Sequence, residues 1–245
     1  MRNIKLVLQY DGTSYHGWQI QPDVVTVEGV LLDGLEKVIG EKVKLSAAAR
    51  TDSGVHARCQ VVSFKTTSSI APKRLKLALN GLIPRDIVVA RASEAAESFN
   101  ARYSARARIY RYAILNRTFR SPFDSHYCYF FPYQVDLDAM KGAVKFLIGK
   151  HDFSSFQASF GKKGRSSVRT VEKLKLFSRA DFVYMDIQAD GFLTHMVRVI
   201  MGTLLDVGRE KILPEDVKKI LEAKDRQKAG PTLPGRGLCL TKVLY

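Results

Sequence analysis

The sequence predicts a protein of the α+β class. Short runs of β-branched, aromatic and alternating apolar residues indicate strands, and longer runs with apolar residues three or four positions apart indicate amphipathic helices. With 245 residues, 46% of them hydrophobic, the chain can bury one large core or two smaller ones. We therefore expect sheets that are covered by helices.

The first half of the chain contains six predicted elements, in the order strand, helix, strand, strand, helix, strand. In the first helix, Val27, Leu31 and Leu35 fall on one face, and Gly40 ends it. This order is the ferredoxin-like order found in many RNA-binding domains. The six elements span residues 3–10, 26–40, 43–49, 60–64, 72–82 and 87–92.

The pattern restarts after Asn116, so we place a domain boundary between Ile114 and Phe123. The expected halves are residues 1–113 and 114–245, with no flexible linker between them. We expect two ferredoxin-like (RRM-like) halves whose antiparallel sheets pack side by side around a central basic cleft, with helices on the outer faces. The second half contains predicted helices over 136–148, 192–207 and 214–223, and predicted strands over 168–177, 182–189 and 238–244.

The charge of the chain points to a polyanionic partner. Its 39 Lys and Arg residues against 24 Asp and Glu residues give a net charge of +15, which favours nucleic acid first and an anionic membrane second. No apolar run is long enough to span a membrane, and the N-terminus is too short and too charged for a signal peptide. The three cysteines lack metal-ligand spacing. We expect a cytoplasmic protein without metal or cofactor.

A polar cluster, ARTDSGVHA from Ala49 to Ala57, separates two predicted strands and is the candidate active site. Asp52 lies two residues from both Arg50 and Gly54. An adjacent guanidinium favours an ionised carboxylate, and glycine lets a substrate approach the backbone closely. Asp52 could therefore be a nucleophile or a base. Asp-Ser-Gly is also an ordinary turn sequence, which is the structural alternative.

Two further segments carry unusual residues. Arginines alternate with aromatic residues between Phe99 and Tyr112, where Arg could bind phosphate and Tyr110 could stack on a base. A half-buried strand with arginine heads in solvent is the alternative. The helix predicted over 192–207 is apolar on nearly every face but contains Arg198. A buried guanidinium requires a partner, and our candidate is the carboxylate of Asp52.

Six motifs in this order resemble the TruA family of tRNA pseudouridine synthases. They are YDGTSYHGWQIQ, ARTDSGVHA followed by QVVSF, FNARYSARARIYRY, HDFSSF, FLTHMVRVIMGTL and AGPTLPGRGLCL. Ala49 and Cys59 stand where the family usually has glycine. The resemblance runs from Tyr10 to Tyr245.

The resemblance implies an isomerase that converts uridine to pseudouridine in the anticodon stem-loop of tRNA, at positions 38 to 40, without a cofactor. It makes Asp52 the catalytic residue, places Tyr110 against the target base and brings Arg198 to Asp52. Arg50, beside Asp52, is the candidate to fill the space that a flipped-out uridine leaves. The resemblance also implies a homodimer in which one tRNA contacts both subunits.

Several alternatives remain open at this point. The chain could be a non-catalytic RNA-binding module, for which the arginine and tyrosine segment would suffice. A hydrolase with Asp52 as nucleophile would need a second carboxylate that the neighbouring sequence lacks. The roles of His56, His151 and His195 are undecided, and a basic loop over residues 161–167 could meet RNA phosphates.

Overall fold

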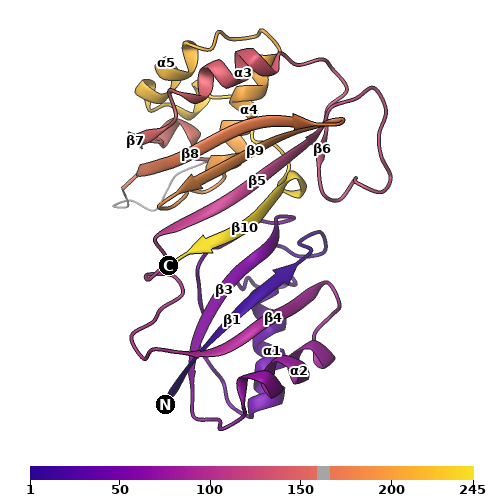
Figure 1. The fold of residues 1–245 in the computed structure, drawn as a ribbon, viewed down its shortest axis with the longest axis vertical. Helices are drawn as coiled ribbons and strands as arrows, with labels where there is room; N and C mark the ends of the chain where they lie inside the picture. Colours follow the sequence, from indigo (N-terminus) through magenta and orange to yellow (C-terminus); the bar gives the residue numbers. More distant parts are fainter. Residues whose placement is uncertain (159–165) are drawn as a thin grey trace. The chain divides into compact units, whose positions relative to one another are not determined.

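The computed structural model describes residues 1–158 and 166–245 and has a mixed α+β architecture, which confirms the predicted class (Figure 1). The chain forms two compact units. The first contains Met1–Arg108 together with Cys239–Tyr245, and the second contains Ile109–Leu238. The halves expected from the sequence, 1–113 and 114–245, assign the C-terminal strand to the second half, whereas nearly all of that strand belongs to the first unit.

The sheet of the first unit has the ferredoxin-like strand order. Strands β4 and β3 both pair antiparallel with β1, and the short β2 pairs with the far side of β3. This arrangement, β4-β1-β3-β2, follows the predicted sequence of elements. The elements are β1 (Arg2–Tyr10), α1 (Val27–Ile39), β2 (Ser46–Ala47), β3 (His56–Thr66), α2 (Pro72–Leu82) and β4 (Ile87–Ala95).

The C-terminal strand β10 (Leu238–Leu244) adds a parallel pairing to β3, in which Cys239 lies opposite His56. The expected sheet was wholly antiparallel, so this pairing is a correction. Beyond β10, the hydroxyl of Tyr245 donates to the carbonyl of Ala101 at 2.9 Å, and Lys5 lies 4.5 Å from the Tyr245 ring centroid. The last residues of the chain are therefore an integral part of the first unit.

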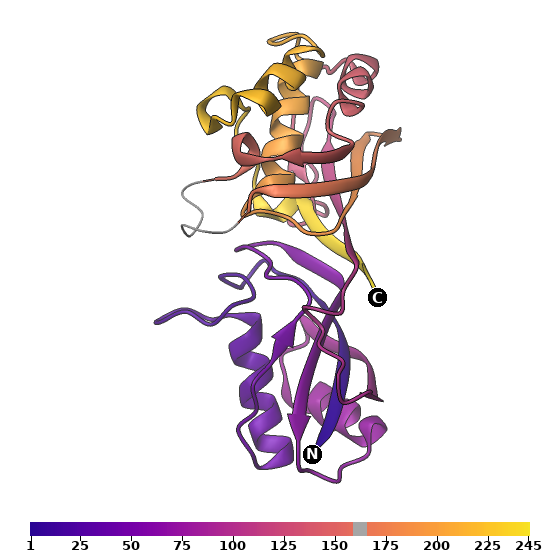
Figure 2. The ribbon, with the colours of Figure 1, turned by 90° about the vertical axis from the view of Figure 1, so that its left-hand side faces the viewer.

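Helix α1 runs beside the sheet of the first unit and has well-defined ends (Figure 2). The hydroxyl of Thr26 accepts from the amide of Gly29, and Gly40 ends the helix with a φ of 71°. Val27, Leu31 and Leu35 are buried, as their spacing predicts. The strand predicted over 43–49 is much shorter than expected, because only Ser46 and Ala47 pair with β3.

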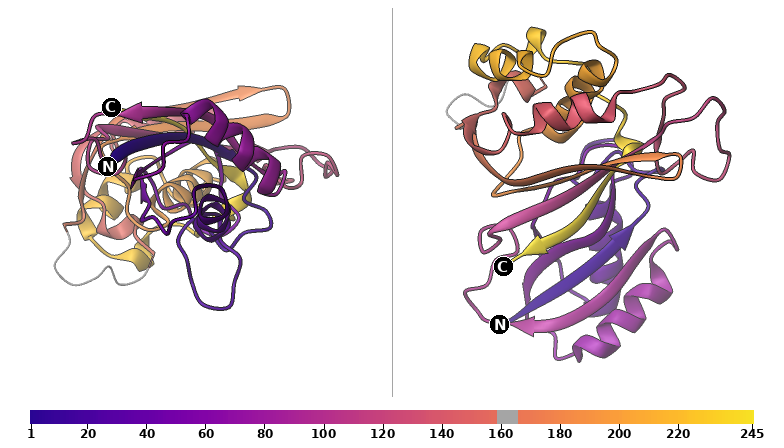
Figure 3. Two further views of the ribbon diagram at one scale, coloured as in Figure 1. Left: turned by 90° about the horizontal axis from the view of Figure 1, so that it is seen from below. Right: turned by 45° about the horizontal axis from the view of Figure 1, so that its top comes forward.

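In the second unit, the sheet order is β5-β9-β8-β7, and β6 pairs in parallel with β5. Helix α3 packs against α4 and against β8 (Figure 3). The elements are β5 (Ala107–Leu115), β6 (Tyr129–Phe130), α3 (Leu137–Val144), β7 (Gly149–Asp152), β8 (Val168–Arg179), β9 (Phe182–Ala189), α4 (Met196–Gly208) and α5 (Asp216–Ala223), with short 3-10 helices at Ser154–Phe156, Arg226–Lys228 and Gly235–Gly237.

Two predicted helices of the second unit differ from the structure. Helix α4 begins at Met196 rather than at 192, because His195 has a φ of 62°, which a right-handed helix does not allow. The helix expected over 136–148 ends at Val144, and the chain turns at Gly149, with a φ of 112°, into strand β7. Neither boundary has a proline that would mark it in the sequence.

Candidate active site

Asp52 lies in the loop between β2 and β3, and this loop is held by backbone hydrogen bonds from the segment after β1. The amide of Trp18 donates to the carbonyl of Thr51 at 2.9 Å, and the amide of Gly54 donates to the carbonyl of Tyr15 at 3.3 Å. Within the loop, the amide of Val55 donates to the carbonyl of Asp52 at 3.1 Å, and Gly54 has a φ of 71°. The Asp-Ser-Gly turn, which was the structural alternative to an active site, is therefore present, and it fixes the backbone at Asp52.

Two glycines of the YDGTSYHGWQ motif touch this loop so closely that no other residue fits. A Cβ atom on Gly12 would lie 2.1 Å from the carbonyl oxygen of Val55. One on Gly17 would lie 2.7 Å from the carbonyl oxygen of Thr51, and the φ of Gly17 is 87°. Backbone atoms cannot move aside as a flexible side chain can. The motif thus fixes the position of the Asp52 loop.

Buried polar side chains support the same loop. The hydroxyl of Tyr10 lies 2.8 Å from Thr51 Oγ1. Gln60 accepts from the amide of Ala49 at 3.2 Å and donates to its carbonyl at 2.8 Å. Burial raises the pKa of Tyr10, so its hydroxyl stays protonated and remains a hydrogen-bonding group. Trp18, which is 1% exposed, packs near Tyr10.

His56 is a buried histidine that braces the start of the loop segment. Its Nδ1 atom accepts from the amide of Gly12 at 3.0 Å and lies 3.1 Å from Asp11 Oδ1. These contacts connect the start of β3 to the segment after β1.

The two predicted site residues of the first unit differ in exposure. Asp52 is half-buried, Arg50 is exposed, and Thr51 between them is buried. The buried threonine is held by the hydroxyl of Tyr10 and fixes the backbone between its two charged neighbours. A half-buried carboxylate on a fixed backbone suits a group that must meet a substrate atom in a defined position.

In the second unit, Tyr110 lies on β5 and is 7% exposed. Its ring contacts that of Phe192 edge to face, with the centroids 5.1 Å apart. Tyr112, on the same face, is fully buried and donates to the carbonyl of Pro234 at 2.7 Å. Burial raises the pKa of Tyr112, so this hydroxyl also stays protonated. Tyr112 therefore packs in the interior of the second unit.

Arg198 lies in the first turn of α4 and is only half-buried. Its Nε atom donates to the carbonyl of Leu233 at 2.6 Å, and its own carbonyl accepts from the amide of Leu233 at 3.4 Å. From the sequence we predicted a carboxylate partner for Arg198 and did not predict this contact with Leu233. A backbone carbonyl can be supplied by any residue, so no side-chain pattern could have indicated it.

The segment from Gly230 to Gly237 packs along α4. A Cβ atom on Gly202 would lie 2.0 Å from the carbonyl oxygen of Pro231. The hydroxyl of Thr203 accepts from the amide of Gly230 and donates to the carbonyl of Val199, both at 2.9 Å. The AGPTLPGRG motif thus fixes α4, and with it Arg198, as the YDGTSYHGWQ motif fixes Asp52.

The HDFSSF segment forms a capped turn. Asp152 Oδ1 accepts from the amide of Ser154 at 3.0 Å and from the hydroxyl of Ser167 at 2.6 Å, while Phe153 and Phe156 are fully buried. Burial alone would raise the pKa of Asp152, but the hydrogen bonds from Ser154 and Ser167 outweigh it and lower the pKa to about 2. Nε2 of His151 lies 2.9 Å from the carbonyl of Ile148. This segment is structural.

The four predicted site residues are divided between the two units. Asp52 and Arg50 lie in the first unit, and Tyr110 and Arg198 lie in the second.

Residues 161–165 of the predicted basic loop are outside the described part of the chain. Over residues 1–158 and 166–245, no group of three or more His, Cys, Asp or Glu side chains could hold a metal ion. Within the same ranges, none of the helices has the length and apolar character needed to cross a bilayer.

Comparison with known proteins assigns a family to this chain. A family described as tRNA pseudouridine synthase matches residues 6–104 and 143–245. Curated proteins named tRNA pseudouridine synthase A from Thermoanaerobacter sp. (strain X514), Caldicellulosiruptor saccharolyticus and Clostridium acetobutylicum are 49%, 46% and 43% identical over 245 residues, which is 100% of each chain. A solved Cbf5-Nop10-Gar1 complex aligns with 97% of this chain and 48% of its own, at 10% identity and a TM-score of 0.40. The family match and the three relatives confirm the resemblance seen in the motifs: the chain belongs to the tRNA pseudouridine synthase family of isomerases.

Proposed function

We propose that this chain converts uridine to pseudouridine in the anticodon stem-loop of tRNA, at positions 38 to 40, and that Asp52 is its essential carboxylate. The N1–C1′ bond of the nucleotide breaks, a C5–C1′ bond forms, C5 loses a proton and N1 gains one. The observation that carries the proposal is the Asp52 loop, held on both sides by backbone hydrogen bonds and by two glycines that admit no side chain.

Asp52 acts in its ionised form, as a nucleophile or as a base. The fixed loop supports this role because a catalytic group that is already in position loses little freedom when substrate binds. The target uridine must leave the stack of bases, which costs a few kcal/mol. Arg50, exposed two residues before Asp52, fills the space that the uridine leaves.

Tyr110 and Arg198 complete the proposed site. The motif positions assign Tyr110 to the flipped uracil, and its edge contact with Phe192 supports a ring held in one orientation. Arg198 is assigned to Asp52, where a guanidinium favours the ionised carboxylate. Its hydrogen bond to Leu233 orients the side chain from the second unit. A homodimer in which one tRNA contacts both subunits is part of this proposal, and the mass in solution, against 27.5 kDa for one chain, tests it.

The decisive experiment is release of tritium from C5-labelled uridine in a tRNA transcript by the wild type and by Asp52→Asn. We expect the rate to fall by at least roughly 10³-fold, since the substitution removes the carboxylate and keeps its shape. Asp33→Asn is the matched control, because Asp33 is an exposed aspartate on α1 of the same unit. Both variants should bind tRNA with the affinity of the wild type.

The alternative is an RNA-binding module without catalysis. It predicts that the wild type binds tRNA and releases no tritium from any uridine. Release by Asp52→Asn at the wild-type rate would contradict the assignment of Asp52 while leaving the enzyme activity intact. The two failures are therefore separable in one assay.

A further inference from the structure

The first unit contains a surface groove of about 880 Å³ that extends beyond the residues of the proposed chemistry. Its walls include residues of α1, of the segments before and after that helix, of β3 and of the segment after β4. This volume is in the upper part of the range of ~300–1,000 Å³ that is usual for ligand sites. Among its lining residues are Trp18, Glu28, Lys42, Lys44, Arg50, Lys65, Phe99, Asn100, Arg102 and Tyr103.

The groove is strongly basic. Five lysines and arginines line it, and Glu28 is its single acidic residue. The carboxylate of Glu28 accepts from the amide of Ile20 at 3.2 Å, so it is already engaged. Lys42 and Lys44 are both exposed and belong to the same wall, two positions apart. Exposed cations along a groove suit the regularly spaced phosphates of a nucleic acid strand.

An exposed aromatic ring also lines the groove. Tyr103 is 78% exposed, yet its backbone is fixed, because its amide donates to Asn100 Oδ1 at 3.1 Å. Asn100 is itself held by the hydroxyl of Ser46 at 2.7 Å. The guanidinium of Arg102 lies 5.3 Å from the centroid of the Tyr103 ring. A tyrosine ring on a fixed backbone, flanked by a cation, is a surface on which an unpaired base can stack.

The groove is continuous with the Asp52 loop. Arg50, two residues before Asp52, lines it, and so does Trp18, whose amide holds the carbonyl of Thr51. A strand of RNA lying in the groove would thus reach the residues that position Asp52. This continuity favours the substrate itself as the occupant over an unrelated acidic protein.

We propose that this groove binds the unpaired RNA strand that adjoins the target uridine, with its phosphates on Lys42 and Lys44 and one base stacked on Tyr103. The inference rests on the proposed function, since the RNA is the tRNA substrate. It adds a second contact region, separate from the residues that act on the uracil.

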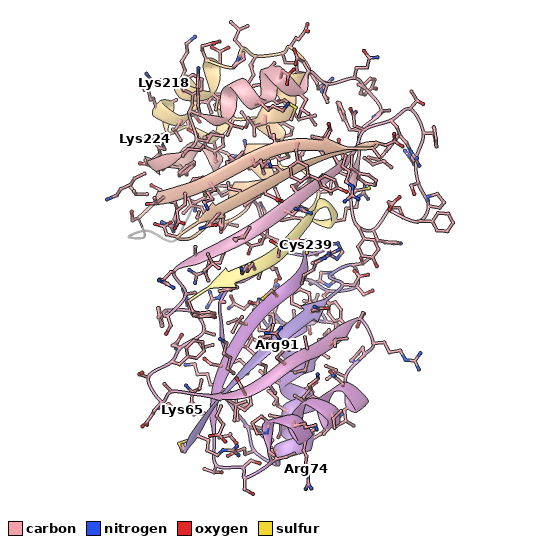
Figure 4. All side chains as sticks on the ribbon, in the orientation of Figure 1. Lys65, Arg74, Arg91, Lys218, Lys224 and Cys239 are labelled. Carbon is pink, nitrogen blue, oxygen red and sulfur yellow. The ribbon has the colours of Figure 1, made fainter. Side chains whose placement is uncertain are left out.

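The first test measures tRNA binding by Lys42→Ala/Lys44→Ala over a series of salt concentrations. Loss of two phosphate contacts lowers the slope of log affinity against log salt by roughly 1.4, because each contact to single-stranded RNA contributes about 0.7. Lys73→Ala/Arg74→Ala is the control, since it removes the same charge from exposed positions on α2. Figure 4 labels Arg74, on α2, and Lys65, which is on β3 and lines the groove.

The second test replaces Tyr103. Tyr103→Ala should weaken binding of tRNA roughly 5- to 150-fold, which corresponds to the ~1–3 kcal/mol of one base stacked on an aromatic ring. Tyr103→Phe keeps the ring and should bind as the wild type does. All these positions are on the surface, so thermal unfolding of each variant should match that of the wild type.

Unchanged salt slope and unchanged affinity in both groove variants would overturn the proposal. So would an equal loss in the α2 control, which would indicate attraction by overall charge. Binding of an acidic peptide by the wild type, abolished in the groove variants while tRNA binding is unaffected, would assign the groove to a protein partner instead. Failure of the proposed function is seen separately, as absence of tritium release by a wild type that binds tRNA.

Discussion

The Asp52 loop and the start of α4 are supported in different ways. Asp52 lies on a loop, so its position depends on hydrogen bonds from another segment and on the close approach of Gly12 and Gly17. Arg198 lies on a helix, whose internal hydrogen bonds already fix its backbone, and the segment after Gly230 only holds that helix in place. A disturbance at the loop should therefore reduce activity first, whereas a disturbance at the helix should reduce stability first.

The largest expected effect tests the loop. Gly17→Ala introduces a Cβ atom 2.7 Å from the carbonyl of Thr51 at a φ of 87°. Displacement of the loop by about 1 Å is enough to slow a reaction by roughly 10²-fold. We expect tritium release to fall by about that factor, at substrate saturation, while the protein remains folded.

Gly40→Ala is the matched control for this substitution. Gly40 has a φ of 71°, close to that of Gly17, but nothing lies within 4 Å of the added Cβ atom. Both variants should lose about 1 kcal/mol or more of stability, since alanine is strained in this conformation. Only Gly17→Ala should lose activity. Equal activity in the two variants would show that the loop does not depend on this contact.

The next effect tests the helix. Gly202→Ala places a Cβ atom 2.0 Å from the carbonyl of Pro231, so the variant should lose roughly 1–3 kcal/mol of stability in urea unfolding. Gly142→Ala on α3 meets its nearest atom, in Pro214, only at 3.9 Å and should gain up to ~1 kcal/mol from helix propensity. A Gly202→Ala variant as stable as the wild type would show that the stability of the protein does not depend on the close contact between Gly202 and Pro231.

The smallest effect compares two buried hydroxyls. Thr203→Val leaves the amide of Gly230 without its partner and should cost about 1–3 kcal/mol. Tyr10→Phe removes the contact with Thr51 at the loop and should cost about 0.5–1.5 kcal/mol, because the hydroxyls of Tyr10 and Thr51 are both neutral. Denaturant midpoints measure the stability, and tritium release should decrease more in Tyr10→Phe. The reverse order of activities would contradict the comparison.

Local patterns in the sequence predicted most of the fold. Three elements have the predicted bounds, because the spacing of apolar residues and the flanking turn residues are local signals. They are the helix 72–82 and the strands 182–189 and 238–244. The boundaries that were wrong depend on distant contacts or on one dihedral angle. His195 adopts a left-handed conformation that its residue type does not predict. Strand β10 pairs with a strand about 180 positions earlier in the chain, and a local pattern does not indicate such a pairing.

The sequence predicted which residues belong to the candidate site, but not the contacts that surround them. The motifs indicated Asp52, Arg50, Tyr110 and Arg198, and these assignments stay predictions until the variants are measured. The contacts that hold them could not be read from the sequence, because Leu233 and the carbonyls of Tyr15 and Thr51 contribute backbone atoms. The sequence does have glycine at the positions where a side chain would collide with such a carbonyl, as at Gly17.

The pairing of β10 with β3 also bears on how the protein is made. Translation produces residues 1–108 first, but their sheet acquires its last strand only when residues 239–245 have left the ribosome. The first unit must therefore wait, with the start of β3 at His56 and Ala57 unpaired on one side, while the whole of the second unit is synthesised. An open strand edge is a site of aggregation, so the interval between the two events is when the nascent chain most needs protection.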